Sequence, residues 1–106
     1  MQESGAVAVD LGRNRALLRG AVVKLAPQEA ELLAMLAQGR GQVMAADRLM
    51  QGLWGNRKPE TAEVRLRGLV LDLRRKLRPR DFDIACYRRQ GYELVDHVLM
   101  PKEVKS

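Results

Sequence analysis

The segment from Arg65 to Leu77 constrains this chain more than any other, because it must both fill a core and remain highly charged. Its thirteen residues, RLRGLVLDLRRKL, include five cations and five leucines. At about 100° per residue, a helix over roughly residues 60–78 gathers its apolar side chains on one face, and Pro79 stops it. The predicted core face comprises Ala62, Leu66, Leu69, Val70, Leu73 and Leu77. The predicted outward face carries Val64, Arg67, Gly68, Leu71, Asp72, Arg75 and Arg78.

Short strands precede this helix and a hairpin follows it. Alternating apolar residues in AVAVDL, RALLR and AVVKL predict a three-stranded antiparallel meander. Helical spacing predicts one helix in APQEAELLAMLAQG and a shorter one in ADRLMQGLWG. FDIACY and YELV flank the turn RRQG and predict a β-hairpin, in which Gly91 supplies an unusual backbone angle. The pattern predicts one α+β domain over residues 6–95, with a flexible N-terminus over 1–5 and a fraying tail over 96–106.

Positive charge is concentrated around the long helix. The formal net charge of the chain is +6, and residues 57–80 contain nine Lys or Arg against three Asp or Glu, which is the same balance of +6. A basic stripe confined to one segment is typical of a protein that binds a phosphate backbone. A solvated charged face would give the same composition, so charge alone leaves both interpretations open.

The other chemistry-bearing residues exclude several classes of protein. Cys86 is the only cysteine and permits no internal disulfide; the opening MQESGAVAVD has no basic start followed by an apolar stretch, and no run of about eighteen apolar residues occurs in the sequence. We therefore expect a cytoplasmic protein that does not enter a membrane. His97 is the only histidine, so we expect no metal, no cofactor and no enzyme activity. Trp54 and Tyr92 are predicted to pack in the core, and Cys86 to be a small buried residue rather than a contact residue.

Two helices, a loop, a longer cationic helix and a hairpin with arginines at its tip together predict a winged helix-turn-helix. A major groove about 12 Å wide admits one α-helix, and the hairpin tip with Arg88 and Arg89 can reach the neighbouring minor groove. We expect a sequence-specific transcription regulator that binds double-stranded DNA, with residues 60–78 in the major groove and a wing over 87–91 in the minor groove. The alternative is a protein-binding adaptor of the same fold, which docks on RNA polymerase or another regulator through Val64, Gly68 and Leu71.

Four separated motifs resemble the DNA-binding effector domain of OmpR/PhoB-type response regulators over about residues 7–95. They are L-x-P-Q-E at the start of the first helix, LWG at the end of the second, LRRKL at the end of the third and GYEL after the hairpin turn. The resemblance implies a four-stranded N-terminal sheet, three helices, a C-terminal wing, and binding as a dimer or tandem pair to direct-repeat promoter sites. The family's receiver domain does not precede the first strand, so we expect either an excised domain or a free-standing regulator.

The resemblance also assigns positions. It places the base-contacting surface on Val64, Arg67, Gly68, Leu71 and Asp72, and the wing arginine at Arg88. Leu71 stands where the family usually has a polar or basic residue, Gly68 where it has a small β-branched one, and Asp72 at a common arginine position. The complete expected DNA interface is Thr61, Val64, Arg65, Arg67, Gly68, Leu71, Asp72, Arg74, Arg75, Arg78, Arg88 and Arg89. The loop that family members use to contact RNA polymerase corresponds to Asn56, Arg57, Lys58 and Glu60.

Overall fold

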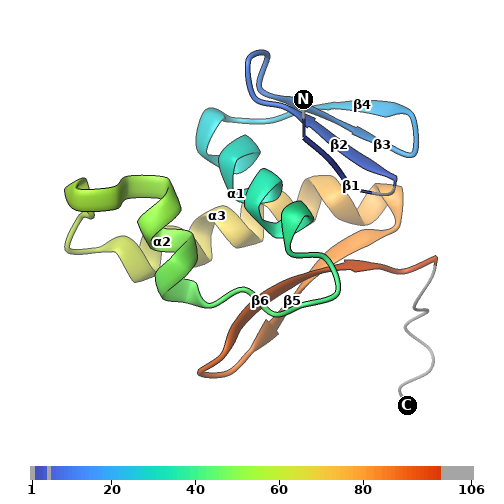
Figure 1. Ribbon diagram of the computed structural model, residues 1–106. Helices are drawn as coiled ribbons and strands as arrows, with labels where there is room; N and C mark the ends of the chain where they lie inside the picture. The colour runs from blue at the N-terminus through green and yellow to red at the C-terminus, as the bar shows by residue number, and fades with distance from the viewer. Residues whose placement is uncertain (1, 5, 99–106) are drawn as a thin grey trace.

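The computed structural model describes residues 2–4 and 6–98, which form an α+β fold. Its N-terminal antiparallel sheet has the order β1-β2-β3-β4 and comprises β1 (Gln2–Ser4), β2 (Val7–Asp10), β3 (Arg15–Leu18) and β4 (Ala21–Lys24). The helices are α1 (Pro27–Gln38), α2 (Ala46–Trp54) and α3 (Ala62–Leu77), and 3-10 turns η1 (Gly55–Arg57) and η2 (Arg78–Arg80) follow α2 and α3. The chain then forms a hairpin of β5 (Phe82–Tyr87) and β6 (Gly91–Asp96). Figure 1 shows the helices between the N-terminal sheet and the hairpin.

The N-terminal sheet has one strand more than the alternation of residues predicts. Three residues of the segment expected to be flexible, Gln2–Ser4, pair with Val7–Val9 of β2. β3 pairs with one edge of β2, and β1 pairs with the other. Without β1, the backbone groups on that second edge would be unpaired beside the core. The sequence QES has no apolar alternation, so the pattern could not predict this strand. The four-stranded sheet implied by the family resemblance is confirmed.

The long helix divides its two faces as predicted, although its bounds are slightly shorter than the expected 60–78. Its core face is buried at Ala62, Leu66, Val70, Leu73 and Leu77, and half-buried at Leu69. Full burial of a leucine side chain contributes about 1.5–3 kcal/mol, so this face accounts for much of the stability that holds α3 in place. No helix in the described part of the chain is long and apolar enough to cross a membrane.

The start of α1 is linked to the end of α3 through a buried carboxylate. Ala26 has no side-chain oxygen to cap the helix, and Glu29 accepts a hydrogen bond from the Ala26 amide at 2.9 Å instead. The same Glu29 oxygen accepts a hydrogen bond from Lys76 Nζ at 2.6 Å. Because a buried carboxylate without partners is costly, this arrangement fixes α1 against the last turn of α3.

A second buried carboxylate joins the hairpin to α3. Asp83, on β5, accepts hydrogen bonds from Arg74 Nε at 3.0 Å, from Arg78 Nε at 3.2 Å and from the Ile84 amide at 2.8 Å. Burial by itself raises the pKa of Asp83, but these hydrogen bonds and the charges of Arg74 and Arg78 outweigh burial and lower it below its ordinary value. We call this group of Asp83, Arg74 and Arg78 the hairpin anchor.

The far end of the hairpin is attached to the N-terminal sheet. Asp96 is buried and forms ion pairs with Arg19, which follows β3, and with Arg40, at 3.5 Å, after α1. The Arg19 guanidinium also lies over the Phe82 ring, 4.4 Å from its centroid, which is a favourable cation–π geometry. The expected fraying tail therefore does not begin at residue 96: Asp96 ends β6, and the His97 amide donates a hydrogen bond to the Asp81 carbonyl at 2.8 Å. Residues 99–106 of that tail lie outside the described residues.

Replacement of Asp83 tests the hairpin anchor through pH. The pKa of Asp83 is lowered in the folded state, so its contribution to stability is complete above the unfolded value of about 3.9 and is lost as pH falls through the folded-state pKa. We expect Asp83→Asn to lower the free energy of unfolding by about 1–3 kcal/mol at pH 7, and the two proteins to converge as pH falls through the folded-state pKa of Asp83. Denaturant unfolding at pH 7 and over a series of acidic pH values measures this difference.

The matched control is Asp81→Asn, which removes an exposed carboxylate from a residue with φ of 65°, a conformation that asparagine tolerates. We expect Asp81→Asn to change stability little at any of these pH values. A destabilisation by Asp83→Asn that persisted undiminished at low pH would contradict an ionic role for the anchor.

Candidate nucleic-acid interface

The outward face of α3 is exposed along its whole length. Val64 and Leu71 retain 62% and 53% of their accessible surface, although both are large and apolar. The other expected contact residues that are exposed on or beside this helix are Thr61, Arg65, Arg67, Gly68, Asp72, Arg75 and Arg78. Since the opposite face is buried, the helix is held rigidly while this face remains available to a partner.

Not all the cations of α3 are available. Arg74 is half-buried and belongs to the hairpin anchor, and Lys76 binds Glu29. Arg78 is shared: its Nε binds Asp83, but more than half of its side chain stays exposed. Arg75 forms an exposed ion pair with Asp72 at 3.4 Å, and such pairs are worth little in water and exchange readily. The last turn of α3 thus neutralises internal acids, whereas Arg65 and Arg67 enter no ion pair with the described residues.

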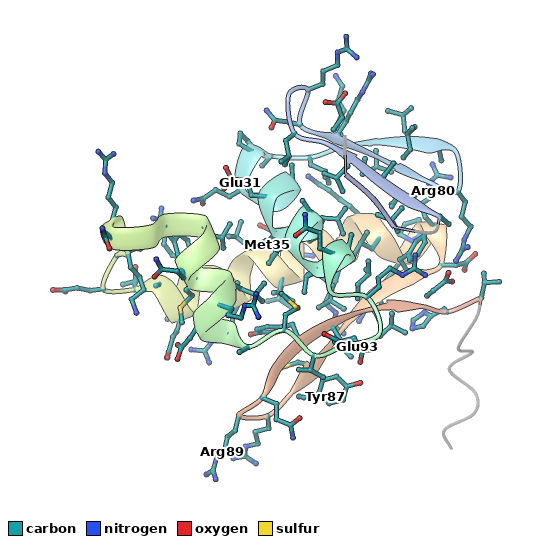
Figure 2. All side chains as sticks on the ribbon, viewed as in Figure 1. Glu31, Met35, Arg80, Tyr87, Arg89 and Glu93 are labelled. Carbon is teal, nitrogen blue, oxygen red and sulfur yellow. The ribbon has the colours of Figure 1, made fainter. Side chains whose placement is uncertain are left out.

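The tip of the hairpin presents two arginines to solvent. Arg88, Arg89 and Gln90 form the turn, and the Gln90 amide donates a hydrogen bond to the Tyr87 carbonyl at 2.9 Å. Arg89 has φ of 66°. A positive φ therefore occurs at this arginine as well as at Gly91, where the sequence predicted an unusual backbone angle. Figure 2 shows Arg89 at the very end of the hairpin, with Tyr87 and Glu93 closer to the body. The Tyr87 hydroxyl donates a hydrogen bond to Glu93 at 2.9 Å, which raises the pKa of Tyr87.

Gly91 fixes the direction of the hairpin. Its φ is 143°, and a Cβ at this position would collide with the carbonyl of Met44. The neighbouring residue Tyr92 makes a two-way backbone bridge to Met44, with N···O distances of 2.7 and 3.0 Å. The hairpin backbone is therefore attached directly to the connection between α1 and α2.

An open groove of about 410 Å³ separates the hairpin tip from the helices. It is lined by the first residues of α2, by Arg67 of α3 and by the hairpin residues from Cys86 to Tyr92. Tyr92 is buried as predicted, and its pKa is raised mainly by burial and further by Cys86 beside it. Arg67 and the wing arginines thus line one concave surface, which we call the wing groove.

Cys86 is exposed, and the prediction that it is a buried residue is wrong. It is two residues after the buried Ile84 and would point inward if the hairpin still lay on the core. At residue 86 strand β5 no longer lies on the core, since Cys86 and Tyr87 are both exposed, whereas Tyr92, paired with Cys86 on β6, is still buried. Trp54, by contrast, packs against the hydrophobic core as predicted.

The loop between α2 and α3 forms a second exposed region. Asn56, Arg57, Lys58 and Glu60 are all exposed. Lys58 and Glu60 line an open cavity of about 440 Å³ between this loop and α2, together with Pro59 and Met50. In the described residues, no group of three or more His, Cys, Asp or Glu side chains is placed to hold a metal ion.

Three helices with an amphipathic third helix, followed by a hairpin that flanks its exposed face, define a winged helix. The model of the family "Transcriptional regulatory protein, C terminal" matches residues 20–94, and the chain belongs to this family, which is the OmpR/PhoB type of effector domain. The transcriptional regulatory protein MoaR1 of Mycobacterium tuberculosis is 35% identical over 82 residues, which are 74% of this chain. The chain spans about a quarter (26%) of the length of that curated relative.

Solved structures agree with this assignment. The DNA-binding domain of CpxR from E. coli is 31% identical, with a TM-score of 0.70, over 89% of this chain and 94% of that domain. The DNA-binding domain of Klebsiella pneumoniae RstA, solved in complex with the RstA box, is 26% identical, with a TM-score of 0.70, over 90% of this chain and 96% of that one.

Substitution by alanine should change the free energy of unfolding in opposite directions at Gly68 and at Gly91. Gly68→Ala should raise the free energy of unfolding by up to about 1 kcal/mol, because Gly68 is in a helix interior and open space surrounds its Cβ position. Gly91→Ala should lower it by about 2 kcal/mol or more, because a Cβ there meets the Met44 backbone and φ is positive. Denaturant unfolding of both variants beside wild type checks this pair. An unchanged Gly91→Ala would show that the hairpin can move away from Met44 at no cost.

Proposed function

We propose that this chain is the DNA-binding domain of a transcription regulator, in which α3 enters the major groove of duplex DNA and the wing contacts the adjacent minor groove. The observation that carries the proposal is the wing groove, where Arg67 of α3 faces Arg88 and Arg89 of the hairpin tip across an open concave surface. The similarity to the domains of CpxR and RstA, whose names describe DNA binding, supports the same activity here.

The dimensions of the molecule suit this role. An α-helix with its side chains is about 10–12 Å wide and a major groove is about 12 Å wide, so α3 can enter with its exposed face against the base edges. The buried face packs on the core throughout, so insertion into DNA requires no rearrangement of the helix. The wing extends beyond the body at one end of the molecule and can follow the sugar-phosphate backbone to the next groove (Figure 1).

Within the interface we assign different roles to different residues. Arg65 and Arg67 are the cations of α3 that form no ion pair with another residue described by the structure, and Arg75 is paired only with an exposed Asp72 there. We propose that these three, with Thr61, contact phosphates and base edges, and that Arg88 and Arg89 contact the minor groove, whose potential attracts arginine. Arg74 belongs to the hairpin anchor. Arg78 binds Asp83 of that anchor through Nε and contacts a phosphate with the exposed part of its guanidinium.

A partner protein has room on a different surface. We propose that the loop of Asn56, Arg57, Lys58 and Glu60 contacts RNA polymerase, because it is exposed, mixed in charge and borders the cavity beside α2. We also propose that two copies bind side by side on repeated DNA half-sites, as the family resemblance implies. These contacts leave the wing groove free, so DNA and a protein partner can be bound together.

Salt dependence tests DNA binding directly. Five candidate contact arginines, Arg65, Arg67, Arg75, Arg88 and Arg89, predict a slope of log K against log salt of about −4 to −5. Raising the salt from 50 to 200 mM should then weaken binding about 500-fold. Fluorescence anisotropy with a labelled duplex measures the slope. Absence of binding at low salt would contradict the proposal and favour a protein-binding adaptor of the same fold.

Two variants that each remove one arginine, one on the wing and one away from it, test whether the wing contacts DNA. Arg88→Ala should weaken DNA binding about 5- to 30-fold, equivalent to about 1–2 kcal/mol, without lowering the melting temperature, because the side chain is exposed at the turn. Arg80→Ala removes another exposed cation, in η2 next to the N-terminal sheet and far from the wing (Figure 2), and serves as the control. Equal losses from the two variants would mean that only net charge matters and that the wing makes no contact of its own.

A further inference from the structure

The exposed face of α3 contains a continuous apolar strip at its centre. Val64, Gly68 and Leu71 are spaced by four and three residues, so they lie on one side of the helix. Val64 and Leu71 are 62% and 53% exposed, and, apart from the adjacent backbone of α3 itself, no atom of the described residues lies within 4 Å of the Cβ position of Gly68. We call these three residues the apolar strip.

The fold itself does not require the apolar strip. Val64 and Leu71 lie outside the hydrophobic core and its partly buried neighbours, and Gly68 disfavours the helix in which it is placed. A large apolar patch exposed on a domain of this size marks a contact surface more often than not. The missing side chain at Gly68 also lets a partner come close to the helix backbone between the two larger residues.

Charge around the apolar strip identifies the occupant. Arg65, Arg67 and Arg75 lie around it, and Arg67 also lines the wing groove. The acidic Asp72 on the same face is ion-paired with Arg75 at 3.4 Å, so the cations outnumber the acid there. A polyanion therefore matches the border of the strip, while its centre lacks hydrogen-bond donors. Duplex DNA offers one apolar group on its base edges in the major groove, the C5-methyl group of thymine. An acidic protein would match the border too, but it would leave the adjoining wing arginines without a partner.

We propose that Val64 and Leu71 select A·T base pairs by packing on thymine methyl groups. This inference rests on the proposed function and deepens it by naming the bases that α3 selects. Seven residues of helix rise roughly 10 Å, which is about three base-pair steps, so the two thymines lie about three base pairs apart. Gly68 leaves room for the base pairs between them. Arg67 and Arg75 hold the helix at this depth through the phosphates.

Replacing thymine by deoxyuracil tests the proposal, because this change removes only the methyl group. A duplex is first selected from a random pool by its binding to the protein at low salt, and is then synthesised with deoxyuracil at every thymine. Burial of one methyl group is equivalent to about a fourfold change in affinity, so two contacts predict about 15-fold weaker binding to the deoxyuracil duplex.

Variants of the apolar strip assign the effect to its residues. The double variant Val64→Ala, Leu71→Ala should bind the thymine and deoxyuracil duplexes equally. Val22→Ala, at an equally exposed valine on β4 (56%), should retain the wild-type preference. Melting temperatures of both proteins establish that each is folded.

The outcomes separate the two proposals. Steep salt dependence without any preference for thymine would overturn this inference and leave the proposed function intact. A double variant that loses affinity equally for both duplexes would show that the strip packs on something other than methyl groups, and would also overturn it. Failure to retain any duplex at low salt would reject DNA binding itself, and the inference with it.

Discussion

The arrangement of this domain depends on one buried carboxylate. Asp83 lies on the hairpin and accepts hydrogen bonds from Arg74 and Arg78 near the end of α3, so it determines how the wing is positioned relative to the helix. An unpaired charge at this depth would be costly, and removal of both arginines would leave the Asp83 carboxylate without a cationic partner on α3 or just after it. Asp96 has the corresponding role toward Arg19 and the N-terminal sheet. Together the two aspartates connect the hairpin with the helix and with the sheet.

The same anchor explains why one helix can carry many cations while only some of them are available to a partner. Arg74 and Lys76 near the end of α3 are used inside the protein, against Asp83 and Glu29. The cations closer to its start, Arg65 and Arg67, are exposed, and Arg67 lines the wing groove. The charge available to a partner is therefore smaller than the composition indicates, and it is placed beside the apolar strip. Counting cations in the sequence overestimates the binding surface for this reason.

Much of the fold could be predicted because its signals are local. The period of α3, the stop at Pro79 and the alternation in the hairpin each depend on residues close in sequence. What could not be predicted depends on contacts between distant segments. Arg19 and Asp96 are separated by 77 residues, and β1 forms only because β2 offers it an edge. The exposure of Cys86 was missed because strand alternation does not show where β5 no longer lies on the core.

The bridge between Tyr92 and Met44 involves only main-chain atoms. This attachment of the wing is thus independent of the side chains at positions 64, 68 and 71 of α3. Evolution can exchange residues at positions 64, 68 and 71 one at a time while the scaffold around them keeps its shape. The scaffold therefore separates the residues that hold the wing in place from the exposed residues of α3 that are free to vary.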